Sequence, residues 1–235
     1  MLGEKFKSRL MCEGDYLNWY TRALTEMLYN IMSDLFSNYN SNSCSKIDLV
    51  DADISLFSSL FSPQEADDFF DILKKDIDWK QEQIKFYGKV HDIPRLTAWY
   101  GEPNKTYVYS GIEVKSSPWT QPLLQIKEKI ETVSNIQFNS VLLNFYRSGD
   151  DGVSWHSDDE PELGRNPVIG SVSFGEPRPF QLKHKSLDDT KQKIILEHGS
   201  YLLMQGETQH HWLHQIPKSK KNMGERINLT FRVIK

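Results

Sequence analysis

The sequence has almost no cysteine and no long apolar run. Only Cys12 and Cys44 occur among 235 residues, so a disulfide framework and a four-cysteine zinc site are both excluded, and a reducing compartment is indicated. No apolar stretch approaches the roughly 18 residues that a membrane-spanning helix needs. The opening residues MLGEKFK lack the apolar core of a signal peptide. These absences predict a soluble intracellular protein, cytoplasmic if bacterial and nuclear if eukaryotic, with no membrane partner.

The sequence also lacks an excess of positive charge. Lysine and arginine number 28 against 32 aspartate and glutamate residues, which gives a net charge of -4. Nucleic-acid-binding proteins usually carry a basic footprint, so the total charge argues against such a partner. Lysines do gather at 183–193 and at 218–221, so a local positive face is still compatible with the sequence.

The chain divides into an extension and one domain. Apolar residues recur at helical spacing over residues 15–36, and Asp15 can cap that helix. Serine and asparagine dominate residues 37–45, which indicates a linker. We therefore interpret residues 1–48 as a helical extension and linker that packs on the domain or on a partner. Residues 49–235 suit a single domain, which we expect to be a monomer.

The domain is predicted to be α+β and mainly β. Ser62, Pro63 and Glu65 predict a helix start, and residues 122–131 predict a second helix. Residues 82–90 predict a strand or hairpin around Gly88. Short strand-like runs then follow, which indicates a sandwich or barrel with helices against one sheet. These runs are 138–145, 168–174, 180–184, 193–196, 201–204 and 226–234.

The final run alternates strictly between apolar and polar residues. One face carries Ile227, Leu229, Phe231 and Val233, and the other carries Arg226, Asn228, Thr230 and Arg232. Arginine does not lose its proton, so if the polar face points inward it needs anions. The two arginines are about 20 Å apart along a strand, and together they could hold the two ends of a short dicarboxylate. The alternative is an edge strand whose arginines face solvent.

His156 and Asp158 are the best candidates for metal ligands. In an extended segment, residues two apart project to the same side and can bind one ion. His214 is our choice for a third ligand, with His210 and His211 as rivals. Two histidines and one carboxylate leave open positions on an iron ion for a cosubstrate and dioxygen, although zinc could use the same ligands.

Several motifs together resemble the AlkB family of iron(II)- and 2-oxoglutarate-dependent dioxygenases, which demethylate alkylated nucleobases. The resemblance covers residues 49–235 and is closest to the DNA-repair branch. It implies a double-stranded β-helix, or jelly roll, with buttressing helices and a substrate lid. The motifs are PRLTAWYGE (94–102), YVYS (107–110), NFYR (144–147), HSDDE (156–160), SVSFG (171–175), His214 and RINLTFR (226–232).

The resemblance also implies roles for individual residues. His156, Asp158 and His214 match the iron ligands. Arg226 matches the group that binds the distal carboxylate of 2-oxoglutarate, and Arg232 and Asn228 match groups at its other end. The remaining matches are Asn144, Tyr146 and Thr230 beside the cosubstrate, and Glu160, Trp99, Tyr100, Tyr107 and Tyr87 beside the substrate base.

The implied activity is oxidative demethylation of 1-methyladenine and 3-methylcytosine in DNA, with Fe(II), 2-oxoglutarate and O2. Tyr87 would be an aromatic wedge that enters the base stack of a duplex. The net charge favours the alternative of an enzyme of the same chemistry that acts on RNA, protein or a small molecule. A non-catalytic jelly roll is disfavoured because all three ligand positions are filled.

Overall fold

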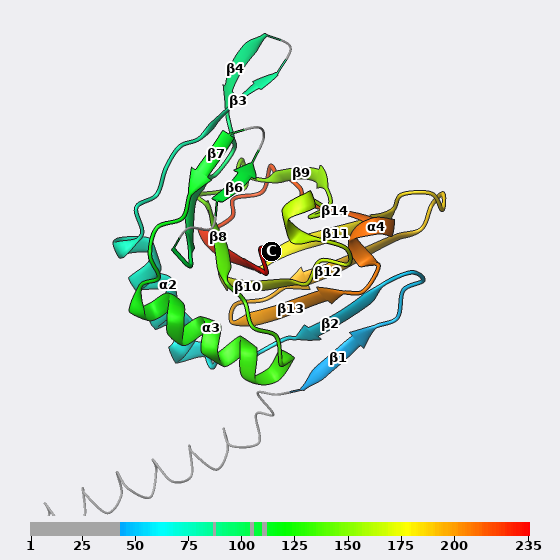
Figure 1. Cartoon of the computed structure of the whole chain (residues 1–235), viewed down its shortest axis with the longest axis horizontal. Coiled ribbons are helices and arrows are strands. Elements are labelled where there is room, and N and C mark those ends of the chain that lie inside the picture. Colours follow the sequence, from blue (N-terminus) through cyan, green and yellow to red (C-terminus); the bar gives the residue numbers. More distant parts are fainter. Residues whose placement is uncertain (1–42, 87, 104–105, 110–111) are drawn as a thin grey trace, which may run out of the picture. The chain divides into compact units, whose positions relative to one another are not determined.

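The structure is a computed structural model that describes residues 43–235 apart from 87, 104–105 and 110–111 (Figure 1). For residues 86, 106–109 and 112–115 it describes the backbone alone. The helix predicted for 15–36 and most of the predicted linker lie outside the described residues. Among the described helices, none is long and apolar enough to cross a membrane.

The larger of two main sheets has seven strands, and every neighbouring pair is antiparallel. Strand β15 (Arg226–Arg232) lies between β10 and β8, so the alternative of an exposed edge strand is wrong. In spatial order the strands are β1 (Cys44–Ile47), β2 (Asp53–Phe57), β13 (Ser200–Gln205), β10 (Ile169–Gly175), β15, β8 (Ser140–Tyr146) and β5 (Leu96–Gly101).

The smaller sheet has four strands, and its inner face packs toward the larger sheet. Its order is β12 (Lys191–Leu196), β11 (Arg178–His184), β14 (Trp212–Ile216) and β9 (Val153–His156). Ile169 and Leu202 of the larger sheet belong to the same apolar cluster as Phe180, Leu182 and Trp212 of the smaller one. Two antiparallel sheets that share one interior confirm the predicted jelly roll.

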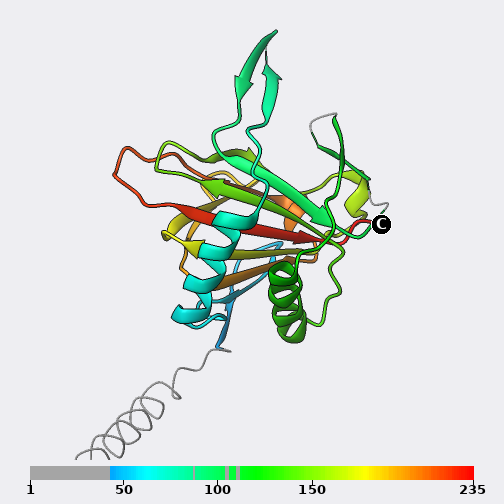
Figure 2. The same cartoon turned by 90° about the vertical axis from the view of Figure 1, so that its left-hand side faces the viewer.

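Helices α2 (Pro63–Asp76) and α3 (Gln121–Ser134) lie on the same side of the larger sheet (Figure 2). Their buried residues Leu73 and Ile126 share an apolar cluster with Leu229 and Phe231 of β15. The apolar face of β15 is therefore covered by helices, and its polar face is directed to the space between the sheets. This confirms both the predicted alternation and the predicted buttressing helices.

Helix α2 begins with the capping box that the sequence indicated. The Ser62 hydroxyl accepts from the Glu65 backbone N–H at 3.3 Å, and the Glu65 carboxylate accepts from the Ser62 backbone N–H at 2.8 Å. Two N–H groups that a helix start leaves unpaired are thereby satisfied. Helix α3 is longer than predicted, and its N-cap residue Thr120 makes no side-chain cap hydrogen bond.

Two hairpins form separate two-stranded sheets. The first joins β3 (Gln83–Phe86) to β4 (Lys89–Asp92), which confirms the predicted hairpin, and it projects away from the main sheets in both views (Figures 1 and 2). Gly88 has φ of 76°, a left-handed conformation that glycine adopts without steric cost. The second joins β6 (Thr106–Tyr109) to β7 (Ile112–Lys115).

The start of the described chain differs from the sequence interpretation. Cys44 begins β1, so the linker predicted through residue 45 ends too late. Strand β1 is short and largely exposed, so it shows no alternation of apolar and polar residues that could have revealed it. The division of the chain at residue 48 stays a prediction.

Replacement of the α2 cap tests this local account. Ser62→Ala should lower the free energy of unfolding by about 1 kcal/mol, because a helix N–H loses its acceptor. Thr120→Ala is the matched control, since Thr120 occupies an N-cap without a cap hydrogen bond, and we expect a smaller loss. Urea unfolding of the three proteins measures both values, and equal losses would contradict the capping account.

Candidate metal centre and cosubstrate pocket

His156, Asp158 and His214 meet between the two sheets. His156 ends β9, Asp158 follows two residues later, and His214 lies on β14 directly opposite His156. One ligand atom from each residue lies within 4.8 Å of the other two. His210 and His211 lie on α4 (Thr208–His211) and are not part of this group. The structure therefore brings together the three ligands that the sequence favoured.

The hydrogen bond of His156 leaves one ring nitrogen available for a metal. Its Nδ1 lies 2.8 Å from the carbonyl oxygen of Ser154. A carbonyl only accepts, so Nδ1 carries the proton and Nε2 keeps its lone pair. A metal-binding histidine usually has its second ring nitrogen fixed by a hydrogen bond of this kind.

Arg232 controls the charge of Asp158. The Arg232 Nη2 donates to the Asp158 carboxylate at 2.6 Å, and both side chains are buried. Burial alone would raise the pKa of Asp158, but Arg232, His214 and His156 together hold that pKa well below its ordinary value. Burial and the neighbouring His156 lower the pKa of His214 to about 3. A carboxylate and neutral imidazoles are the forms that bind a divalent metal.

Arg226 lies in the same pocket with unsatisfied hydrogen-bonding capacity. It is 1% exposed, its Nη2 donates to the Ser173 hydroxyl at 2.9 Å, and its guanidinium lies 5.1 Å from the centre of the Tyr146 ring. Its Nε and Nη1 have no hydrogen-bond partner among the described residues. Burial lowers its pKa to about 10, so it stays charged at neutral pH. A buried cation with unused N–H donors suits an anionic ligand.

Polar side chains line the pocket between Arg226 and the three metal-ligand candidates. Asn228 donates to the Ser171 hydroxyl at 2.8 Å and accepts from Thr230 at 3.1 Å. Asn144 accepts from Arg95 Nε at 2.7 Å. All the predicted cosubstrate residues line this pocket, namely Asn144, Tyr146, Arg226, Asn228, Thr230 and Arg232. The donor set thus fits both a divalent metal and a dicarboxylate.

A family comparison decides the identity of this fold. Residues 53–232 match the model of the 2OG-Fe(II) oxygenase superfamily. The chain belongs to that superfamily. Iron(II), 2-oxoglutarate and dioxygen are therefore its cofactor and cosubstrates, in agreement with the donor set of the pocket.

Curated relatives narrow the family further. The bovine alpha-ketoglutarate-dependent dioxygenase alkB homolog 3 is 43% identical over 180 residues, which is 73% of this chain and 62% of that protein. Human DNA oxidative demethylase ALKBH2 is 37% identical over 191 residues, or 76% of this chain and 72% of that protein. The alkB names confirm the resemblance to the AlkB family. The chain spans a little under two thirds of the alkB homolog 3 relative.

A solved structure supports the fold of this oxygenase. The structure of OsALKBH1 superimposes with a TM-score of 0.56 and 16% sequence identity, over 81% of this chain and 100% of that one. At this identity the likeness concerns the arrangement of strands and helices alone.

Only some of the residues expected beside a substrate base lie at or near the pocket in the described structure. Glu160, which precedes the short helix η1 (Pro161–Leu163), lines the pocket, and its Oε2 is buried without a hydrogen-bond partner among the described residues. Trp99 lies on β5, with its ring 5.9 Å from the Arg232 guanidinium. Tyr87 lies outside the described residues, and Tyr107 lies on β6 with only its backbone described.

Tyr100 corrects the expectation that it contacts the base. It is the neighbour of Trp99 on β5, so its side chain points to the opposite face of the sheet. There it is 6% exposed in the apolar cluster formed with the helices. The motif match placed both aromatic residues together, whereas strand alternation separates them.

Arg95 is a pocket residue to which the sequence gave no role. It is 5% exposed, lines the pocket and donates to Asn144 and to the Gly152 carbonyl. It lies just ahead of β5, where no alternation marks it as inward. Only its membership of the matched motif could have drawn attention to it.

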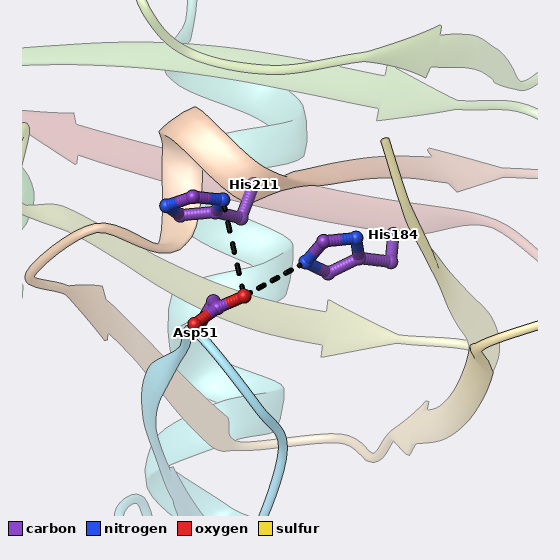
Figure 3. A group of neighbouring side chains, drawn as sticks. All are labelled: Asp51, His184 and His211. Atoms are coloured by element: carbon purple, nitrogen blue, oxygen red, sulfur yellow. Dashed lines mark hydrogen bonds and ion pairs between the residues drawn. The ribbon is translucent and has the colours of Figure 1, made fainter. Parts of the chain in front are cut away.

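A second group with potential ligands has the wrong hydrogen bonds for a metal. Asp51, His184 and His211 lie close together (Figure 3). The His184 Nδ1 accepts backbone N–H groups of Ser186 and Leu187 at 3.2 and 3.0 Å, so Nε2 must carry the proton of the neutral ring. That Nε2 faces Asp51 at 3.3 Å. The group therefore joins the β1–β2 turn to β11 by a hydrogen bond, with no lone pair available on Nε2 for a metal.

Metal titration tests the different assignment of the two groups. The metal-free protein should bind one equivalent of Co(II), because in the second group the protonated Nε2 of His184 cannot serve as a ligand. His214→Ala should lose this binding, and His211→Ala should retain it. Calorimetry and the visible absorption of Co(II) measure the stoichiometry. Two equivalents in the wild-type protein, one of them lost in His211→Ala, would contradict the argument from the tautomers.

Proposed function

We propose that this protein is an iron(II)- and 2-oxoglutarate-dependent dioxygenase that demethylates 1-methyladenine and 3-methylcytosine in DNA. The observation that carries the proposal is one pocket that combines a two-histidine, one-carboxylate group with the unsatisfied guanidinium of Arg226. The relatives named DNA oxidative demethylase ALKBH2, which are 35% to 37% identical, support DNA as the substrate.

The residues of the chain contribute position and charge. When bound, iron and 2-oxoglutarate use dioxygen to hydroxylate the N-methyl carbon, which leaves as formaldehyde, while the cosubstrate becomes succinate and carbon dioxide. His156, Asp158 and His214 would hold the metal through two imidazoles and one carboxylate, a ligand set that leaves positions for cosubstrate and dioxygen. Arg226 binds the distal carboxylate through the N–H donors that have no protein acceptor.

Two residues support a base as the substrate. The buried, unpaired Oε2 of Glu160 could accept a hydrogen bond from an exocyclic amine or attract a cationic alkylated ring. Trp99 lies on the same side of β5 as the pocket and offers a flat apolar face near Arg232. A base taken out of the stack needs both kinds of contact. We propose that Tyr107 adds a second aromatic face and that the enzyme acts as a monomer.

A second candidate keeps this chemistry and changes the substrate to RNA, protein or a small molecule. The net charge of -4 favours a protein or a small molecule within this candidate, because the protein as a whole repels a polyanion. Competition among single-stranded DNA, duplex DNA and RNA that carry the same methylated base would separate the two candidates. Preference for RNA would support the second candidate.

Turnover of methylated oligonucleotides tests the proposed activity. With Fe(II), ascorbate and 2-oxoglutarate, we expect DNA that contains 1-methyladenine or 3-methylcytosine to lose 14 Da per lesion, the mass of the CH2 group that demethylation removes. Mass spectrometry checks this outcome. Asp158→Asn is the inactive control, because an amide no longer supplies an anionic ligand. An unchanged mass with iron shown to be bound would refute the repair assignment.

Tyr87 provides a test of duplex recognition. If its ring enters the base stack, Tyr87→Ala should reduce demethylation of duplex DNA more than that of single strands, because only the duplex requires unstacking of a few kcal/mol. Val90→Ala on the exposed strand β4 is a control for general changes of the hairpin. Equal losses on both substrates would rule out the wedge.

A further inference from the structure

Arg178 is a fully buried cation outside the set of residues that line the pocket. It begins β11 and is 0% exposed. Its guanidinium donates to the carbonyl oxygens of Ser148, Asp151 and Pro217 at 3.1, 2.9 and 2.8 Å. All three acceptors are neutral, and its Nε has no hydrogen-bond partner among the described residues. The charge of Arg178 is thus held in place without direct contact to a carboxylate.

Arg178 and Arg226 share one aromatic ring. The Arg178 guanidinium lies 5.7 Å from the centre of the Tyr146 ring, and that of Arg226 lies 5.1 Å from it. Tyr146 lies opposite Arg226 in the β8–β15 pairing and lines the pocket. Two cations beside one ring repel each other, and Arg178 further lowers the pKa of Arg226, after the larger effect of burial. An anion bound at Arg226 would relieve that repulsion.

Nearby carboxylates do not provide this anion. Asp151 is engaged by Arg147 at 2.8 and 2.9 Å and acts on Arg178 as a nearby charge without a side-chain hydrogen bond. Glu176 likewise acts on Arg178 through its charge, with a smaller effect than that of Asp151. The end of the pocket at Arg226 therefore carries more positive charge than Arg226 alone supplies.

We infer that Arg178 is a positioning residue for 2-oxoglutarate, which orients Tyr146 and adds a second positive charge behind Arg226 in favour of a distal carboxylate. The inference rests on the proposed role of Arg226. Arg178 does not line the pocket, so it acts on the cosubstrate through the Tyr146 ring and through the electrostatic potential at that end of the pocket. Its three hydrogen bonds to carbonyl oxygens hold the guanidinium in one position, which a side chain without these bonds would not keep.

Binding of two oxo acids separates this role from a purely structural one. 2-Oxopentanoate has a methyl group where 2-oxoglutarate has its distal carboxylate, so the ratio of the two dissociation constants reports on the binding of that carboxylate. We would measure both constants by calorimetry on Mn(II)-loaded protein without oxygen. Arg178→Gln should lower the preference for 2-oxoglutarate roughly tenfold, and Arg178→Lys by about two- to threefold, since lysine keeps the charge but not the fork.

Arg147→Gln is the matched control. Arg147 begins the loop whose carbonyls Arg178 contacts, but its side chain is 45% exposed and lies outside the pocket. The preference for 2-oxoglutarate over 2-oxopentanoate should therefore not change. If Arg178→Gln folds and weakens the binding of both oxo acids equally, the inference is overturned and Arg178 has a structural role. If that variant does not fold, Arg178→Lys decides, and an unchanged ratio overturns the inference.

Arg226→Met distinguishes this inference from the function on which it rests. We expect it to abolish the preference for 2-oxoglutarate. An unchanged preference in Arg226→Met would refute the proposed anchor itself. Loss in Arg226→Met together with no change in Arg178→Gln would refute the role of Arg178 alone.

Discussion

Two arginines on the inward face of a central strand set the electrostatic requirement for the whole pocket. Burying an arginine away from water costs several kcal/mol unless an anion or hydrogen-bond acceptors compensate for it. Arg232 meets this requirement with Asp158, whose carboxylate it holds ionised in the interior. Arg226 has the Ser173 hydroxyl and the Tyr146 side chain as partners, and neither is a carboxylate. The same strand therefore maintains a metal ligand at one end and requires an external anion at the other.

Hydrogen-bond donors and acceptors around histidines decide which cluster can bind a metal. The Nδ1 of His156 faces a carbonyl, so Nε2 keeps its lone pair. The Nδ1 of His184 faces two backbone N–H groups, so Nε2 carries the proton. Both groups contain two histidines and one aspartate within similar distances. Proximity alone does not distinguish the two groups. The hydrogen bond made by the second ring nitrogen of each histidine does, because it fixes whether Nε2 is protonated.

Much of the fold and of this site could be predicted from local sequence. The alternation in β15, the two-residue spacing of His156 and Asp158, and the capping box at Ser62 are short-range patterns with one geometric outcome each. Tyr100 was misplaced because a motif match carries no information about which face of β5 each residue occupies. Arg95 and Arg178 act through partners 49 and about 30 residues away, and no local pattern encodes such contacts.

The separation of the two arginines explains why the pocket needs a ligand of defined length. Arg226 and Arg232 lie at the two ends of β15, and Asp158 is paired with Arg232, so this carboxylate does not neutralise Arg226. A second internal acid at Arg226 would neutralise that cation but would compete with any bound dicarboxylate. The described residues place no carboxylate in hydrogen-bond contact with Arg226, and its partners are a hydroxyl and an aromatic ring. An oxo acid whose two ends reach the metal and Arg226 completes the charge balance that the protein leaves open.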